Sequence, residues 1–375
     1  MPADLQMIAR SGDLKVDLVH FVEARRYRKD LERYLDVAFN GVVPDDEAET
    51  FNSIDRFILQ ARQRDGKTVV EHFITAHREL PPAERDLLLG WSDVVEGYFR
   101  VEQVTDDHIV VLNLLDEMAY SVYSNIGPGM FSSLTAGMFL HMRIVPVGDV
   151  WITSGTMRVF AEQDKERILA AAGTLASARP ELVFRNPATL ALAWDLQRKQ
   201  RDAFIECFGS DTIVGTAAEL TVQLDELTRI MRASMPESER SATATDNPVD
   251  NVHWENAFTG SRESDRIAVI YDELEGLNVF YEYGLVEEAF ANPELAAERQ
   301  HRAAIAELVK EPEVTPLVLR RLVVKYPDTA DDAIRRALNL TRFAWEKDGE
   351  RLIRRFKGDW SEKTHLPTPI PTRLS

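Results

Sequence analysis

The stretch Met138–Phe160, MFLHMRIVPVGDVWITSGTMRVF, is the clearest β-sheet signal in the chain. In its first part, Met138–Val145, successive side chains point to opposite faces of a strand. Gly148-Asp149 then suits a tight hairpin, because glycine supplies the positive φ that such turns require. A second β-like run, Val150–Phe160, follows directly. The pattern predicts two neighbouring antiparallel strands.

Three more short runs rich in Val, Ile and Tyr precede this pair: Tyr98–Val104, His108–Leu114 and Met118–Ser124. Turn residues separate them. Short strands at regular spacing are typical of an antiparallel meander or a small barrel. We therefore expect a central five-stranded antiparallel sheet or small barrel within residues 93–160.

Helical spacing dominates on both sides of this β unit. Residues 1–92 are predicted to form an N-terminal helical region. One of its helices should begin at a capping box, in which Thr68 is followed three residues later by Glu71. Residues 161–235 are predicted to be helical and to pack with the β unit.

Residues 236–250 are polar and contain prolines, which predicts a linker. Beyond it, residues 251–375 are expected to form a C-terminal helical module with one strand at Ile267–Tyr271. The fold class is therefore α+β, mainly α. A length of 375 residues fits two or three domains.

Composition narrows the class of protein. Apolar residues make up 45% and charged residues 28%, as in folded globular proteins. The single cysteine, Cys207, excludes an intramolecular disulfide and a multi-cysteine zinc site in one chain. The N-terminus has no apolar core of a signal peptide, and no apolar run is long enough to cross a bilayer. We expect a cytoplasmic protein without membrane association.

The charge is unevenly distributed. A net charge of −18 argues against broad affinity for nucleic acid or anionic lipid. Residues 314–375, however, hold 13 Lys and Arg against 8 Asp and Glu. The C-terminal end is thus a basic segment on an acidic protein, although solvated helix faces would give the same count.

One face of the strand Met138–Val145 is a candidate ligand site. His141 and Arg143 share this face with an aromatic ring, and Trp151 across the hairpin turn is a candidate third member. An arginine flanked by aromatic rings can hold a carboxylate, a phosphate or a base. Alternatively, this face packs against the N-terminal helices and Arg143 pairs with an acid. An enzyme would require His141, Arg143 and a carboxylate to converge on an open pocket.

The C-terminal module offers a second candidate. Two predicted short helices, Pro316–Lys325 and Ala330–Leu338, are joined by a tight turn and have the outline of a helix-turn-helix. The nucleic-acid-binding candidates are their basic residues, Arg320, Arg321, Lys325, Arg335 and Arg336. Asp331-Asp332 at the start of the second helix would repel phosphate, so an ordinary helical hairpin is the favoured interpretation.

The motifs of catalysis and cofactor binding are missing from the sequence. The eight histidines lack the spacing of a metal site, and no nucleophile elbow or phosphate-binding loop is present. We expect no resident metal or cofactor, and no catalytic residue is predicted.

Several segments resemble a group of uncharacterised bacterial proteins, largely actinobacterial, some relatives of which carry a C-terminal SEC-C zinc motif. The segments that carry the resemblance are Thr68–Phe73, Gly90-Trp91 with Gly97-Tyr98-Phe99, Arg143–Trp151, Arg185-Asn186-Pro187, Phe208–Asp211 and Trp345–Glu350. The group implies no activity. Lys363–Pro367 contains no cysteine, so the zinc motif of those relatives is absent here.

Three functions remain open. The first is a non-enzymatic cytoplasmic scaffold or regulator that binds a protein partner or itself, as its charge asymmetry suggests. The second is association with nucleic acid through the basic C-terminal helices or the β unit. The third is an enzyme with a pocket around His141 and Arg143.

Overall fold

The computed structural model describes residues 3–23, 25–42, 47–234, 254–259, 265–358, 360 and 364–371. The chain forms two compact units, Met1–Ala191 with Ile370–Ser375 and Leu192–Pro369. The boundary falls within the long helix α8 (Pro187–Phe208). No helix in the described part of the chain combines the length and apolarity that a bilayer crossing requires.

The first unit opens with the predicted helices. They are α1 (Ala3–Glu23), α2 (Arg25–Ala38), α3 (Glu47–Leu59), α4 (Val69–Ala76) and α5 (Pro82–Gly90). The capping box at α4 is confirmed, because the Glu71 amide donates to Thr68 Oγ1 at 3.2 Å and the Thr68 amide donates to the Glu71 carboxylate at 2.7 Å. Buried side chains of these helices, such as Trp91, form one core with Val145 and Ile152 of the β unit.

The β unit is a closed barrel, and all five predicted strands are present. They are β1 (Val95–Val104), β2 (His108–Asn113), β3 (Ala119–Tyr123), β4 (Phe139–Val147) and β5 (Val150–Phe160), in the order β1-β2-β3-β5-β4. The long strand β1 pairs with β4 through its first half and with β2 through its second. This architecture is that of the OB-fold, a five-stranded Greek-key barrel.

The expectation of a purely antiparallel sheet was wrong. Strands β3 and β5 run parallel, with Val122 opposite Trp151 and Tyr123 opposite Ile152. The reason is geometric: an odd number of strands cannot alternate in direction all the way around a closed barrel. One neighbouring pair must therefore be parallel, and the sequence periodicity of each strand carries no information about which pair it is.

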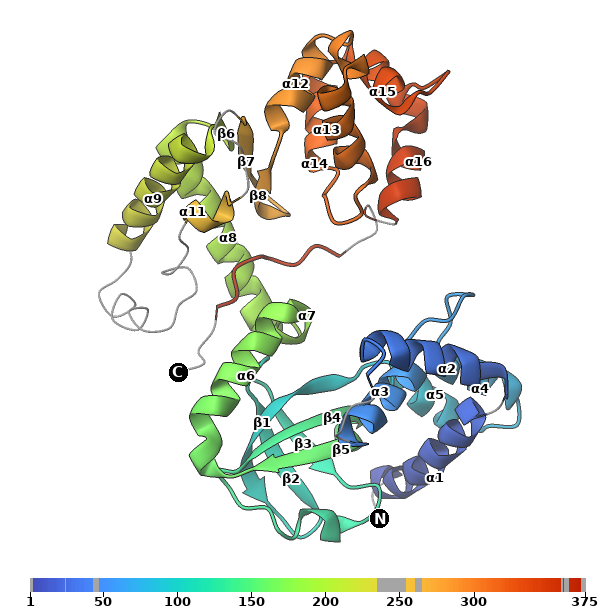
Figure 1. The fold of residues 1–375 in the computed structure, drawn as a ribbon. Helices are drawn as coiled ribbons and strands as arrows, with labels where there is room; N and C mark the ends of the chain where they lie inside the picture. The colour runs from blue at the N-terminus through green and yellow to red at the C-terminus, as the bar shows by residue number, and fades with distance from the viewer. Residues whose placement is uncertain are drawn as a thin grey trace. The chain divides into compact units, whose positions relative to one another are not determined.

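The barrel interior is packed. Leu140, Met142 and Ile144 of β4 point inward, as the alternation predicts, and Phe131 of the short helix η1 (Pro128–Phe131) joins the same core. Figure 1 shows α1–α5 on one side of the barrel and α6 (Lys165–Ala178) on the other. Helices α1, α3 and α5 pack on β4 and β5, whereas α6 and the short α7 (Pro180–Val183) pack on β1.

The second unit is built around a three-stranded antiparallel sheet, β6 (Thr212–Gly215), β7 (Ile267–Asp272) and β8 (Gly276–Phe280). The predicted strand at Ile267–Tyr271 is β7. One face of the sheet, with Ile270, belongs to the core of the following helices, and the other, with Val269, packs with residues of α8 and α9. The expected linker, 236–250, lies outside the described residues.

Helices surround this sheet and complete the mainly α fold. Among the described residues, the second unit's helices after α8 are α9 (Ala217–Ser234), α11 (Trp254–Ala257), α12 (Tyr283–Ala291), α13 (Arg299–Lys310), α14 (Leu317–Lys325), α15 (Ala330–Leu338) and α16 (Trp345–Lys357), with the 3-10 turn η4 (Leu295–Ala297). The 3-10 turn η2 (Glu162–Asp164) belongs to the first unit, before α6. The two predicted helices of the helical hairpin are confirmed as α14 and α15.

Candidate functional site

Arg143 on β4 lies in a closed ionic cluster. Its side chain is only 1% exposed. Its Nε donates to Asp55 at 3.1 Å, its Nη1 to Glu96 at 2.7 Å and its Nη2 to Gln60 at 2.9 Å. Asp55 comes from α3, Gln60 follows α3 and Glu96 lies on β1, so the guanidinium joins three parts of the first unit.

The partners of Arg143 are themselves bound by further cations. Glu96 also accepts from Arg56 at 2.6 Å and from Arg179 at 3.0 Å. Asp55 also accepts from Lys15 of α1 at 2.8 Å. Burial alone would raise the pKa of the Asp55 and Glu96 carboxyls, but the nearby cations outweigh burial and lower both pKa values. Both groups are therefore carboxylates at neutral pH.

Ser154 also belongs to this cluster, and its hydroxyl is engaged in hydrogen bonds there. Its hydroxyl donates to Asp55 at 2.8 Å and accepts from Lys15, and it is only 3% exposed. Burial lowers the pKa of the Lys15 ammonium, which Asp55 partly restores. The cluster thus fastens α1 and α3 to the barrel.

The three ligand-binding candidates of the first unit do not converge. His141 stacks on Tyr98, with ring centroids 4.7 Å apart, and burial lowers the pKa of its imidazole. Trp151 lies on the inner side of the barrel against Tyr120, because it pairs with Val122 rather than with an outward residue. Arg143 is buried among its partners from α3 and β1, and the charges of Glu96 and Arg143 both act on the His141 imidazole.

A different surface of the barrel is open. No described α-helix covers the outer faces of β2 and β3 along their length, although the short η1 contacts β2 and Tyr123 at the end of β3 packs against the core of the N-terminal helices. Three cross-strand pairs point outward from these strands: His108 with Tyr123, Val110 with Ser121 and Leu112 with Ala119. We call these six residues the β2–β3 face. Val110 and Leu112 are half-buried but belong to none of the hydrophobic cores.

The chemistry of the β2–β3 face is apolar and aromatic at its centre and acidic at its margins. His108 and Tyr123 stack at 4.8 Å with ring planes 16° apart. The adjoining loops carry the exposed Asp106 and Asp107 and the half-buried Glu117. Residues 101–142 contain five acidic residues and no lysine or arginine. This run without cations is a signal that the sequence analysis missed.

The five basic candidates of the C-terminal helices are all held in ion pairs. On α14, Arg320 binds Glu350 at 3.0 Å, Arg321 binds Asp211 and Asp272 at 3.1 Å, and Lys325 binds Glu287 at 2.6 Å. On α15, Arg335 and Arg336 pair with Asp332, and Arg336 also pairs with Glu294. Acidic side chains therefore already neutralise the cations that the sequence nominated.

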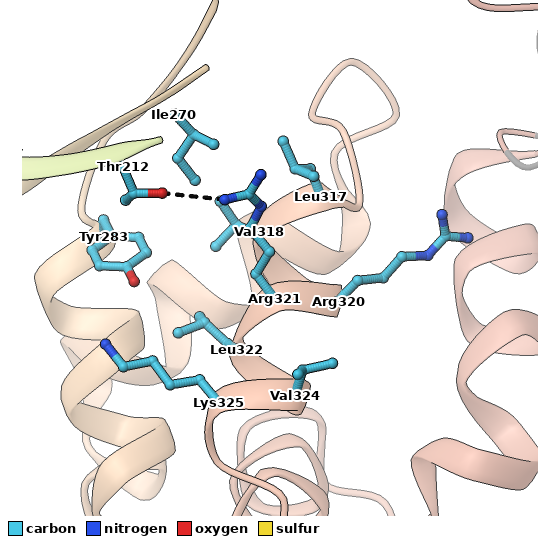
Figure 2. A pocket seen from close by; sticks show the side chains of 10 residues that line it. All are labelled: Thr212, Ile270, Tyr283, Leu317, Val318, Arg320, Arg321, Leu322, Val324 and Lys325. Atoms are coloured by element: carbon cyan, nitrogen blue, oxygen red, sulfur yellow. Dashed lines mark hydrogen bonds between the residues drawn. The ribbon is translucent and has the colours of Figure 1, made fainter. Parts of the chain in front are cut away.

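The α14 residues line a shallow cavity of about 430 Å³ between the sheet, α12 and α14. Figure 2 shows its apolar floor, with Ile270 and Leu322, and the guanidinium of Arg321 aimed at Thr212, to whose hydroxyl it donates at 3.2 Å. Tyr283 at the margin donates to Glu287, and burial raises the pKa of its phenol. Because Arg321 is committed to three oxygen-bearing side chains, it offers little capacity for an anionic ligand.

Metal ligands do not gather anywhere in the described residues: no group of three or more His, Cys, Asp or Glu side chains is arranged to hold a metal ion. Cys207, half-buried beside the core of α8 and α9, is a free thiol.

Comparison with known proteins adds a family for part of the chain. Residues 6–180 match the model of a family of unknown function, DUF7986. The matched stretch includes most of α1, the rest of the N-terminal helices, the whole barrel and α6, and thus both the Arg143 cluster and the β2–β3 face. No curated protein and no solved structure matches the chain.

Proposed function

We propose that this chain is a non-enzymatic binding protein whose β2–β3 face receives an apolar, basic segment of a protein partner. The observation that carries the proposal is that no α-helix among the described residues packs along this face, on a barrel whose β1, β4 and β5 are all covered. In OB-fold barrels the corresponding strands form the usual binding surface. That correspondence is an analogy of fold, so the local chemistry must decide the ligand.

The charge of the residues around this face distinguishes between a protein ligand and a nucleic-acid ligand. Oligonucleotide-binding barrels combine aromatic side chains with a positively charged groove that follows the phosphates. Here His108 and Tyr123 supply the aromatic rings, but the adjoining loops are acidic, and Arg100, opposite Leu112 on β1, is paired with Glu102. Phosphates would be repelled, whereas Lys or Arg side chains of a partner would be attracted to the loops beside Val110 and Leu112.

The burial of the polar and charged side chains around Arg143 also supports a binding role. Arg143, Lys15 and Ser154 have the side chains that catalysis would use, yet their hydrogen bonds are directed at one another and at Asp55 and Glu96. We also propose that the protein is located in the reducing cytoplasm. We further propose that it is related to the bacterial proteins some of which carry a SEC-C motif. The single cysteine supports the first, and the resemblance of segments such as Arg143–Trp151 supports the second.

The test compares two double variants of the full chain in a nuclease-treated native lysate. Val110→Lys with Leu112→Lys places two cations on the β2–β3 face, and Val222→Lys with Ile230→Lys makes the same change on α9, where both residues are exposed. We expect partners captured by the wild type to be lost only by the first variant. Mass spectrometry of the captured proteins and thermal unfolding of both variants provide the readout.

A crosslinker at Ser121 identifies contact directly. A photoreactive residue at Ser121 should join a protein whose crosslinked peptide is rich in Lys or Arg. Capture that is equal in the two variants, or a crosslink to nucleic acid in the untreated lysate, would contradict the proposal. Binding of a sugar by the wild type without any protein crosslink would point instead to an oligosaccharide ligand and contradict it equally.

A further inference from the structure

A group of exposed positive charges lies on α16, outside the helices that the sequence nominated. Lys347, Arg351, Arg354 and Arg355 are all exposed. Their spacing of four, three and one residues places them on one side of the helix. Arg342, in the turn that precedes α16, is exposed as well. We call these five residues the α16 basic face.

Two of the three acids beside this face, Asp348 and Glu350, are already engaged, whereas Glu346 in the first turn is exposed. Asp348 accepts from the backbone amide of Ala344 at 3.1 Å and pairs with Arg351 at 2.7 Å. Both carboxylate oxygens of Glu350 accept from Arg320 of α14, at 3.0 and 3.1 Å. The face therefore keeps an excess of positive charge. Arg342, Lys347 and Arg355 form no ion pair with any residue that the structure describes.

Helix-end electrostatics account for only part of the face. Cations in the last turn, here Arg354 and Arg355, are stabilised by the negative end of the helix dipole. Lys347 lies in the first turns of the helix and Arg342 lies before it, where the dipole disfavours a cation. The dipole therefore does not account for Arg342, Lys347 and Arg351, which lie outside the last turn.

The apolar side of α16 excludes one class of partner. Leu352 is buried, and Trp345 and Phe356 are packed against the same core of the second unit. Helices that lie on membranes insert an apolar face beside their cations. Here that face is already occupied by the protein's own core, which leaves electrostatics alone for the partner.

We propose that the α16 basic face binds the phosphate backbone of a nucleic acid, independently of the protein-binding β2–β3 face. Successive turns of the helix present cations about 5.4 Å apart along its axis, so several phosphates of one strand can be contacted together. Four of the five cations are arginines, whose guanidinium groups bind phosphate oxygens in a bidentate manner. Contacts of these side chains to phosphate oxygens carry no sequence information, so we expect binding that is independent of sequence.

The experiment measures binding of the full chain to a fluorescently labelled single-stranded RNA, and to duplex DNA, of about 20 nucleotides per strand. Lys347→Glu, Arg351→Glu and Arg355→Glu are combined in one variant. A matched variant reverses three exposed cations of the first unit, Lys29, Arg64 and Lys67. Both change the net charge equally, so a difference between them reports the position of the charges.

We expect the wild type to bind at about 50 mM NaCl and to lose affinity steeply toward about 200 mM. The α16 variant should bind at least ~30-fold more weakly, and its salt slope should fall by about 3, one for each lost phosphate contact. The matched variant should stay within about threefold of the wild type, because long-range charge is screened over about 10 Å. Circular dichroism should confirm that both variants are folded.

Three outcomes would overturn the proposal: no binding by the wild type at about 50 mM NaCl, equal weakening by the two variants, or binding that is insensitive to salt. Vesicles containing phosphatidylserine provide the remaining arm. If the wild type binds them but neither nucleic acid, the face is a membrane contact and the proposal fails. None of these results bears on the β2–β3 face, because its variants leave α16 unchanged.

Discussion

Nη1 of Arg143 lies 2.7 Å from Oε2 of Glu96, and the arginine side chain is only 1% exposed. The two residues face each other across β4 and β1, next to α3. In such a buried pair, the removal of one partner leaves the other charge without compensation in a medium of low polarity. This ion pair therefore controls whether the helical layer stays attached to the barrel.

Arg143→Met should destabilise the first unit by about 3–5 kcal/mol, because Glu96 and Asp55 would keep buried charge without their central cation. Hydrogen exchange of β4 in increasing urea measures the loss in the full chain. Arg33→Met is the control, since Arg33 is 60% exposed and pairs only with Asp30. It should cost less than about 1 kcal/mol. Equal costs for the two variants would show that the cluster has no stabilising role.

The same cluster predicts the acid sensitivity of the first unit. The arginines hold the pKa of Glu96 below its usual value of about 4.3 in the folded state. Its contribution to stability is therefore present above about pH 4.3 and is lost as the pH falls through the folded-state pKa. Glu96→Gln should lower stability at pH 7 but flatten the decline below pH about 4. Urea unfolding at several pH values tests this, and parallel pH profiles for the two proteins would refute it.

Gly155 on β5 should not tolerate a side chain. Its φ is +68°, and a Cβ there would collide with the side chain of Asn52, whose Oδ1 accepts from the Thr156 amide at 2.7 Å. Gly155→Ala should cost about 1–3 kcal/mol, measured by thermal and urea unfolding. By contrast, Gly173 of α6 has open space around it, and Gly173→Ala should stabilise the protein by about 0.5–1 kcal/mol.

Arg321 should matter for stability rather than for anion binding. It ties α14 to Asp211 before β6 and to Asp272 at the end of β7, each at 3.1 Å. Arg321→Gln should destabilise the second unit by about 1 kcal/mol, a modest value because the side chain is about one-third exposed. Arg336→Gln, whose acidic partners are exposed, should cost less than about 0.5 kcal/mol. Hydrogen exchange of β7 distinguishes the two, and nucleic-acid affinity should change in neither.

Much of the fold could be predicted because its signals are local. Alternation along Met138–Val145 identified the inward side chains of β4, and the Thr68–Glu71 pair identified the start of α4. The net positive charge of residues 314–375 could also be counted from the sequence. The sequence could not reveal that Arg320 and Arg321 are held in ion pairs, because ion pairing depends on distant acids: Asp211 lies 110 residues before Arg321. The exposed arginines of α16 could be separated from these only in the folded chain.

By itself, the sequence determined the secondary structure, the five strands of the barrel and the mainly α class, because each depends on the periodicity of neighbouring residues. Only the tertiary structure decided that the barrel closes through a parallel β3–β5 pair. It also decided that Arg143 is buried beneath α3. The tertiary structure alone also shows that no described α-helix packs along β2 and β3. These features arise from contacts between segments far apart in the chain. Arg143 and Asp55, for example, are 88 residues apart, and no local pattern encodes their meeting.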